Sequence, residues 1–350
     1  MLAPLLRVKS QERMNDLRKT GLFFFPILLI QVGVMAVSSV LAQQSEEFVL
    51  IRGGTFQMGD VWGDGQFAMS ETPVHQVTLG DFLLGKHEVT VGEFRTYVTA
   101  TGYTTVAETD AGSTPEPPLV RDGKTFYPSW KYHWFDQRDD HPVIMIAWED
   151  AIRYCNWLSR KQGLPPAYNE ETGRLLDANG SPTTDVRQVI GFRLPTEAEW
   201  EFAARERGRT VRFGNGQNIA RAEEMNFDAA GTGPGVPSLR LPANNRNPYN
   251  EPGPYRDGTT PVASFRPNAL GLYDMSGNVW EWCSDTGGTG FTADKQVNPC
   301  SQDTAGHILR GGTYMTDAKA CRVSARIDWG ARAKCSASGF RVARTVSTEN

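Results

Sequence analysis

The hydrophobic and polar positions predict short strands separated by long irregular tracts. Residues 48–51 form a short apolar run that indicates a strand, and residues 74–84 alternate apolar and polar positions as a half-buried strand does. Three tracts between the patterned segments, 105–142, 163–190 and 206–260, are rich in Gly, Pro, Asn and Asp. We interpret them as ordered coil, because strongly patterned segments lie on both sides of each one.

Three helices are indicated by their starting signals. Thr90 and Glu93 have the spacing of a capping box, in which the hydroxyl accepts from one free backbone N–H and the carboxylate accepts from another. Thr196 and Glu199 have the same spacing. Between these two, a helix that begins near Glu149 carries apolar residues on one face. The sequence therefore predicts a mixture of strands and helices with much irregular structure.

Two further acids of the third predicted helix, Glu197 and Glu201, lie four residues apart and therefore on one face. A pair of carboxylates can carry acid–base chemistry. We interpret this pair as a solvated helix face instead, because Glu199 between them is used by the capping box.

Composition and charge narrow the class of protein. The chain has 350 residues, with 36 Lys and Arg against 40 Asp and Glu, for a net charge of -4. This balance offers no cationic field for a phosphate backbone, so we expect no nucleic-acid partner. The 35 Gly, 21 Pro and nine Trp favour a loop-rich fold with aromatic anchors over a helical bundle or coiled coil.

The N-terminal region indicates export. Residues 21–42 form an apolar stretch that follows a basic pair and ends in small and aliphatic residues, as a cleavable signal peptide does. We predict a signal peptide at 1–42, with Met14 as a possible true start, and a periplasmic or secreted mature protein without stable membrane insertion. The alternative is a membrane anchor, which the length allows, but Pro26 and Gln31 interrupt the apolar stretch.

The five cysteines exclude the common close-spaced sites. Cys155, Cys283, Cys300, Cys321 and Cys335 include no C-x-x-C pair, which argues against a zinc ribbon or a ferredoxin-type cluster. An exported protein experiences oxidising conditions, in which some thiols can pair. The odd number leaves at least one thiol unpaired within the chain.

The longer motifs occur in an order that resembles the formylglycine-generating enzyme, or sulfatase-modifying factor, family. The resemblance runs from about Phe48 to Arg344. The motifs are IRGGTFQMG (51–59), ETP (71–73), KHEVT (86–90), HPV (141–143), GFRLPTEAEWE (191–201), GLYDMSGNVWEW (271–282), RGGT (310–313) and GFR (339–341).

The resemblance implies an α+β fold that is irregular, loop-rich and C-type-lectin-like, with low regular secondary structure. It places one domain at 43–350, with its core at 48–344. The family covers several activities, so it indicates fold better than function. Its namesake oxidises a sulfatase cysteine to formylglycine with copper and oxygen, and relatives include iron-dependent sulfoxide synthases, a periplasmic maturation protein for the siderophore pyoverdine, and non-catalytic paralogues.

The resemblance also locates the candidate catalytic residues. In the namesake, two cysteine thiolates bind copper(I) after the Gly-Gly segment. Aligned without gaps, Thr316 takes the place of the first cysteine and Cys321 that of the second, whereas a gapped alignment moves Cys321 off the site. Either alignment lacks the thiolate pair, which argues against authentic formylglycine generation. Trp280, Thr313 and Thr316 would line a substrate groove, with Cys321 as a nucleophile, a metal ligand or a structural cysteine.

The five histidines are scattered, without the spacing of an iron site: His75, His87, His133, His141 and His307. The redox metal is therefore unknown from the sequence. We expect His87 and His141, which lie in framework motifs, to be structural. His133 and His141 flank an aromatic loop, so convergence in the fold stays open.

Calcium is the ligand that the resemblance supports. Side chains at Asp274 and Glu281 and carbonyls at Gly277 and Val279 match a family calcium site, and they supply the hard oxygen donors that calcium needs. Asn226 would belong to a second site, with a downstream acid such as Asp257. Both calcium ions would be structural.

The sequence therefore favours an exported family member that acts on or binds a peptide-like or peptide-derived substrate, such as an oxidative maturation factor. The alternative is a non-catalytic module that binds a protein or a glycan. The oxidative maturation factor would need a redox cofactor, whereas the binding module would not, so the presence of such a cofactor distinguishes the two hypotheses.

Overall fold

The computed structural model describes residues 47–65, 69–110, 117–232, 249–288, 290–303 and 306–346. The chain divides into two compact units, Met1–Phe48 and Val49–Asn350. Only Glu47 and Phe48 of the first unit are described, so the predicted signal peptide lies outside the described residues. Within the described part, every helix is too short or too polar to span a bilayer.

The second unit is built from short strands, few helices and long connections. The strands are β1 (Phe48–Ile51), β2 (Gly54–Met58), β3 (His75–Leu79), β4 (Phe82–Gly85), β5 (Leu119–Arg121), β6 (Lys124–Phe126), β7 (Trp280–Thr286), β8 (Gln296–Val297), β9 (Gly306–Arg310), β10 (Arg326–Gly330), β11 (Ser338–Gly339) and β12 (Ala343–Thr345). The helices are α3 (Val91–Thr101), α4 (Val106–Thr109), α5 (Trp148–Lys161), α6 (Glu197–Ala204) and the 3₁₀ turn η1 (Val186–Gln188).

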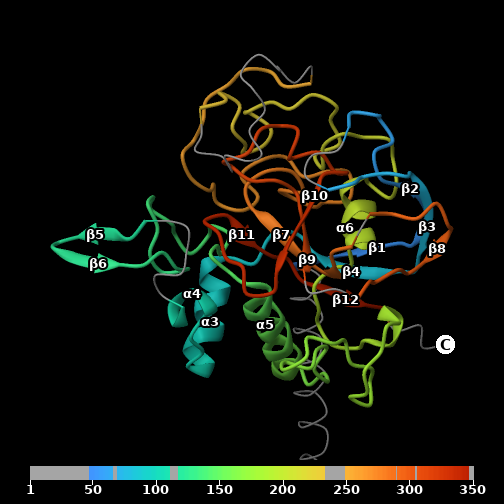
Figure 1. The fold of residues 1–350 in the computed structure, drawn as a ribbon, viewed down its shortest axis with the longest axis horizontal. Helices are drawn as coiled ribbons and strands as arrows, with labels where there is room; N and C mark the ends of the chain where they lie inside the picture. The colour runs from blue at the N-terminus through green and yellow to red at the C-terminus, as the bar shows by residue number, and fades with distance from the viewer. Residues whose placement is uncertain are drawn as a thin grey trace, which may run out of the picture. The chain divides into compact units, whose positions relative to one another are not determined.

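The strands form small mixed sheets (Figure 1). One has the order β10-β9-β7-β11, in which β7 and β9 are antiparallel while β11 runs parallel to β7. The others have the orders β1-β4-β12, β2-β3-β8 and β5-β6. All seven residues of β7 are buried, which makes this strand the centre of the core. The prediction of an irregular, loop-rich α+β fold is confirmed.

The single strand predicted at 74–84 is two strands in different sheets. β3 ends at Leu79 and β4 begins at Phe82. The Asp81 carboxylate accepts from the backbone N–H of Gly53 (2.8 Å) and pairs with Arg52 (2.6 Å). These contacts hold a turn within the alternating pattern, and alternation alone does not reveal a turn.

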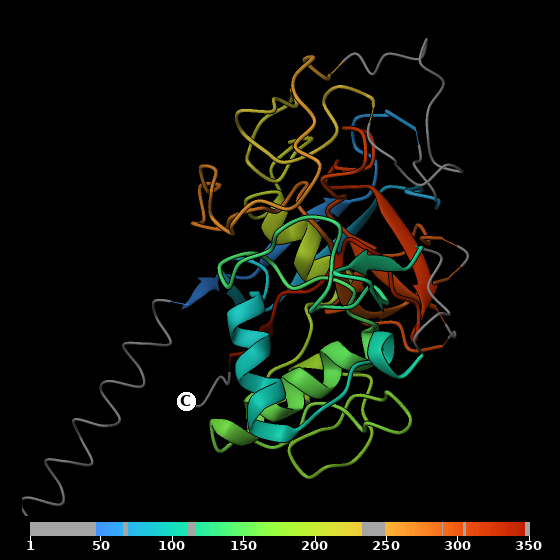
Figure 2. The same ribbon diagram turned by 90° about the vertical axis from the view of Figure 1, so that its left-hand side faces the viewer.

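The predicted helices are confirmed. The side chain of Thr90 caps α3 and that of Thr196 caps α6, each with its glutamate in a complete capping box. α3 lies beside α5, below the sheets in Figure 1 and in front of them in Figure 2. Aromatic rings fill their contact, since Tyr154 of α5 lies 5.9 Å from Phe94 and 5.6 Å from Tyr97, centroid to centroid.

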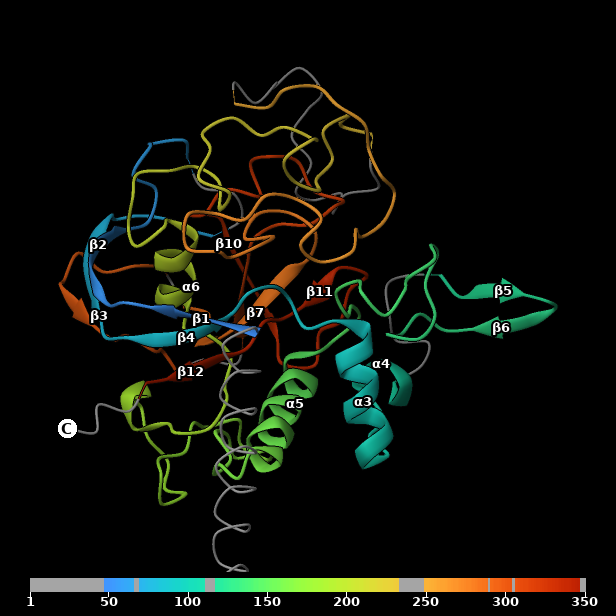
Figure 3. The same cartoon turned by 180° about the vertical axis from the view of Figure 1, so that it is seen from behind.

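α6 lies against the strands at the other side of the unit, next to β2 and β3 in Figure 3. Its Phe202 ring lies 5.2 Å from that of Phe56 on β2. Trp200 is fully buried and donates its indole N–H to Glu281 of β7 at 2.8 Å. The helix is therefore surrounded by protein, and none of its eight residues is exposed.

Candidate functional site

The acids of α6 are buried ion-pair partners. Glu201 is fully buried, accepts from the side chain of Arg205 (2.8 Å) and the backbone of Gly59 (2.9 Å), and pairs with Arg310. Glu197 accepts two bonds of 2.6 Å from Arg326. The interpretation as a solvated helix face is wrong, because arginines more than 100 positions along the chain cover this face.

Pairs of this kind join the motifs that carry the family resemblance. Each places an arginine of one segment on a buried carboxylate with good geometry, which compensates the cost of removing both charges from water. The pairs are Arg193–Glu199, Arg310–Glu201, Arg326–Glu197, Arg322–Glu71 and Arg341–Glu281. These five carboxylates therefore belong to a rigid frame and are not free for catalysis.

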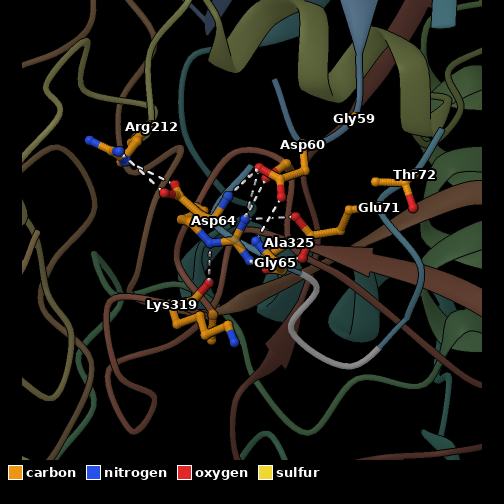
Figure 4. A network of polar contacts seen from close by, with 12 residues as sticks. Gly59, Asp60, Asp64, Gly65, Glu71, Thr72, Arg212, Lys319 and Ala325 are labelled. Carbon is orange, nitrogen blue, oxygen red and sulfur yellow. Dashed lines mark hydrogen bonds and ion pairs between the residues drawn. The ribbon is translucent and has the colours of Figure 1, made fainter. Parts of the chain in front are cut away.

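One pair of this frame fixes the backbone beside Cys321. The Arg322 guanidinium donates to both carboxylate oxygens of Glu71 (2.7 and 2.8 Å), to the carbonyl of Gly65 (2.9 Å) and to that of Lys319 (3.1 Å). Figure 4 shows this network, in which residues from opposite ends of the sequence converge. The segment that carries the candidate catalytic residues is thus held firmly at its C-terminal end.

Thr316 and Cys321, which the ungapped alignment puts at the positions of the two cysteines, lie close together in the structure. Thr316 Oγ1 lies 3.6 Å from Cys321 Sγ. The hydroxyl also accepts from the backbone N–H of Thr313 (2.9 Å) and donates to its carbonyl (3.1 Å). Gly312 has a φ of +74°, and a Cβ there would lie 2.5 Å from Cys321 Sγ, so the tight turn requires glycine.

The surroundings of the Cys321 thiol disfavour its thiolate form. The residue is fully buried, and burial raises the pKa of its thiol to about 12. A thiolate is the form that attacks carbon or binds a soft metal, and it is absent near neutral pH. A hydroxyl opposite a protonated thiol does not fit copper(I), so no step is routed through that metal.

The expected open groove is not formed by its predicted residues. Trp280, Thr313 and Thr316 are 1%, 1% and 6% exposed. A substrate on the surface of the described residues therefore does not reach these side chains without a local opening. None of the five cysteines, all of which lie in the described ranges, forms a disulfide with another, so ion pairs and packing hold the frame together.

The predicted calcium ligands differ in whether other groups already occupy their oxygen atoms. Both oxygens of Glu281 accept from Arg341 at 2.6 Å, and one also accepts from Trp200. Glu281 therefore does not fit a calcium ligand in this arrangement. One carboxylate oxygen of Asp274 accepts a hydrogen bond from the backbone N–H of Ala263 at 2.8 Å. Gly277 has a φ of +86°.

Asn226 lies against the same segment. Its backbone carbonyl accepts from the N–H of Asn278 (2.8 Å), and a Cβ on Gly277 would lie 2.2 Å from that oxygen. Its side-chain amide donates to Gly258 (2.9 Å), which leaves a buried Oδ1 with no hydrogen-bond donor among the described residues. This oxygen is the donor that best fits the predicted calcium.

The histidines form no transition-metal site. Within the described ranges, no group of three or more His, Cys, Asp or Glu side chains is arranged to hold a metal ion. His141 Nδ1 is hydrogen-bonded to Thr259 (2.9 Å), and His87 Nδ1 donates to the carbonyl of Glu88 (2.8 Å), in keeping with structural roles. His133 is buried elsewhere, against Trp130.

A cavity that the sequence did not predict lies between α3 and the tract that follows β6. Its volume is about 490 Å³, and its lining includes Trp130, His133 and Phe135. The Phe135 ring lies 5.5 Å from that of Tyr314, which follows Thr313 directly. The cavity therefore reaches toward the candidate catalytic segment. The cluster of aromatic residues and a histidine at 130–135 was its only sequence signal.

Residues 35–346 match the family model described as the sulfatase-modifying factor enzyme 1-like domain. The formylglycine-generating enzyme of Streptomyces coelicolor is 32% identical over 311 residues, which cover 79% of this chain and 82% of that relative. The Mus musculus enzyme of the same name is 30% identical, over 85% of this chain and 74% of its own. Chaperone protein LppX of Paenibacillus barcinonensis is 27% identical, over 86% and 90%.

Two solved structures share the fold. PvdO from Pseudomonas aeruginosa has a TM-score of 0.57 and 24% identity, and the match covers 85% of this chain and 94% of that one. Treponema denticola variable protein 1 also has a TM-score of 0.57 and 24% identity, over 85% of this chain and 95% of its own. The predicted resemblance is confirmed at the levels of sequence family and fold.

Proposed function

The chain belongs to the sulfatase-modifying factor family, and on that premise we propose that it is an exported member that binds or acts on a peptide-like substrate without generating formylglycine. One observation carries the proposal. Thr316 and Cys321 face each other at 3.6 Å where the namesake enzyme has two thiolates, and the remaining thiol is buried and protonated.

The test is direct. The purified protein is loaded with copper(I) under reductant and incubated in air with a sulfatase-derived cysteine peptide, with the Streptomyces coelicolor enzyme as a positive control. We expect the peptide mass to stay unchanged with this protein and to shift with the control. Conversion of the cysteine to an aldehyde by this protein would refute the proposal.

Whether the substrate is processed or only bound depends on a redox centre. The buried thiol favours a non-catalytic binding module, and the family includes a relative that is named a chaperone. An oxidative maturation factor would need a transition metal or another redox group and would consume oxygen. Metal content is measured on protein purified without chelator, followed by oxygen consumption with candidate peptides. Stoichiometric metal with turnover would overturn the binding module.

Export has its own test. The mature protein should begin near Gln43 when it is recovered from the periplasm or the medium. N-terminal sequencing of the recovered protein measures this, and an intact N-terminus in the membrane fraction would contradict export by a cleaved signal.

A further inference from the structure

The cavity beside α3 has the size and lining of a small-molecule site. α3 and the base of the β5–β6 hairpin lie side by side in Figures 1 and 3. The cavity between them has a volume of about 490 Å³, within the range of known ligand pockets. Val91, Trp130 and Phe135 supply an apolar wall. Cavities with such walls bind the apolar part of a ligand.

His133 supplies a buried hydrogen-bond acceptor. Its Nε2 lies 3.1 Å from the carbonyl oxygen of Trp130, and a carbonyl only accepts, so Nε2 carries the proton. Burial lowers the pKa of His133 to about 4, and the ring is neutral at pH 7. Nδ1 therefore presents a lone pair, and no donor among the described residues satisfies it. The residue is 4% exposed and lines the cavity.

Gln137 supplies a second acceptor. Its amide nitrogen donates to the carbonyl of Pro142 (2.6 Å) and to the hydroxyl of Thr259 (3.3 Å), which fixes the orientation of the amide. The oxygen, Oε1, is buried and has no donor within the described residues. A buried acceptor without a donor costs about 1–3 kcal/mol, so two on one lining call for a ligand that donates. Asp136 adds a carboxylate to the same lining.

One cation of the lining is uncompensated. Arg95 pairs with Asp139 at 2.7 Å, and Lys131 pairs with Glu108 at 2.6 Å. Arg121 donates from one nitrogen to the carbonyl of His133 (2.6 Å), and no carboxylate pairs with it in the described part of the chain. Its remaining N–H groups form the fork that carboxylates bind.

We propose that this cavity binds a zwitterion with an apolar side chain, either a free amino acid or a short peptide. The carboxylate pairs with Arg121 and the ammonium with Asp136. A local rearrangement of the lining then lets the ammonium donate to His133 Nδ1 and Gln137 Oε1, which solvent does not reach in the structure. An ammonium has three N–H donors, which matches these three acceptors in number. The apolar side chain packs on the aromatic wall. The inference rests on the proposed function, because it names the chemistry of the peptide-like ligand.

Isothermal titration calorimetry tests the proposal with L-phenylalanine and the dipeptide Phe-Phe as probes. We expect at least one of them to bind with a 1:1 stoichiometry. N-acetyl-phenylalanine lacks the ammonium and phenylalaninamide lacks the carboxylate, and we expect each to bind at least tenfold more weakly than the free amino acid. Tighter binding of the dipeptide identifies a peptide as the source, and tighter binding of phenylalanine identifies the free amino acid.

Two exposed substitutions test the assigned contacts without disturbing the core. Arg121→Gln should weaken binding at least tenfold by removing the partner of the carboxylate, and Asp136→Asn should weaken binding of the ammonium-bearing probes only. Arg138→Gln is the matched control, since Arg138 lies in the same tract but pairs with Asp140 outside the lining. Circular dichroism confirms that each variant is folded.

Three results would overturn the proposal: no binding of either probe by the folded wild-type protein at millimolar concentration, equal binding of the blocked probes, or an equal loss in Arg138→Gln. These binding measurements do not depend on whether the protein oxidises a substrate, so the cavity and the proposed function are tested separately. A protein that binds phenylalanine but no peptide supports the cavity and contradicts a peptide-like substrate, whereas absence of oxygen consumption leaves the cavity unaffected.

Discussion

At the scale of single residues, the proposed function depends on position 316, where the ungapped alignment puts a threonine in place of a cysteine of the namesake enzyme. The ungapped alignment puts Thr316 and Cys321 at the positions of the two cysteines, and in the structure Thr316 Oγ1 lies 3.6 Å from Cys321 Sγ. The sequence left the gapped alternative open, because the choice depends on how the backbone turns at Gly312. It did not predict that Cys321 is fully buried, since burial depends on the segments packed around it.

Restoring the missing thiol should restore a soft-metal site. We expect Thr316→Cys to bind copper(I) with near-equal stoichiometry, because two thiolates at this distance suit that ion and metal binding releases their protons. The wild-type protein should retain none in competition with a copper(I) chelator. Thr316→Cys with Cys321→Ser is the matched control and should lose the metal again. Equal retention by wild type and Thr316→Cys would contradict the prediction.

His307 makes stability depend on pH. Its ring stacks on Trp148 at 3.6 Å, and burial lowers the pKa of its imidazole to about 4, against about 6.5 in the unfolded chain. Between these values the unfolded state binds more protons. The contribution is therefore complete above about pH 6.5 and is lost as the pH falls toward 4. The loss is about 2 kcal/mol at pH 5.

His307→Phe keeps a ring on Trp148 and removes the titration. We expect the difference in unfolding free energy between pH 8 and pH 5 to shrink by about 2 kcal/mol in this variant. Urea denaturation at the two pH values measures it. An unchanged difference would show that other groups cause the acid sensitivity.

At the scale of elements, α6 shows what a local pattern can and cannot predict. Its capping box was predicted because Thr196 and Glu199 are three positions apart, and both partners belong to the helix itself. The burial of Glu197 and Glu201 was missed, because Arg310 on β9 and Arg326 on β10, which cover them, lie more than 100 positions away. From the sequence alone, charged side chains on a short helix are predicted to face solvent, because their partners in the tertiary structure are not known.

Breaking an α6 ion pair should be costly. Glu201→Gln leaves Arg310 and Arg205 buried without their shared charge, and we expect a loss of about 3–5 kcal/mol in unfolding free energy. Arg138→Ala breaks the exposed pair with Asp140 and should cost no more than about 1 kcal/mol. Urea unfolding of both variants gives the comparison. Similar losses in the two variants would show that the α6 pairs do not hold the frame.

At the scale of the whole molecule, the sequence motifs predicted the fold because they are the places where distant segments meet. Arg341 binds Glu281, and Arg310 binds Glu201, so in each pair two separate motifs contribute one half of a buried contact. The cavity was not predicted, because its lining comes from α3 and from a tract without regular periodicity. Such a tract is placed by packing and side-chain hydrogen bonds, which no local pattern encodes.

Calcium is a prediction about the whole molecule, because an ion that binds only the folded state stabilises all of it. At a concentration one hundred times the Kd the gain is about 2.7 kcal/mol. The sequence prediction relied on Asp274 together with Glu281, but Glu281 is held by Arg341, so Glu281→Gln should lower the Tm equally with and without EDTA.

Asp274→Asn and Asn226→Ala test calcium without breaking the Arg341 ion pair. We expect EDTA to lower the Tm of the wild-type protein by about 5 °C, the shift that this gain in free energy implies for a large domain. The effect of EDTA should be smaller in each variant than in the wild-type protein, because each variant lacks an oxygen donor of one of the two predicted calcium sites. Differential scanning calorimetry with EDTA and with excess calcium measures the shift. If EDTA leaves the wild-type Tm unchanged, then the ion pairs alone stabilise this region and the calcium prediction is wrong.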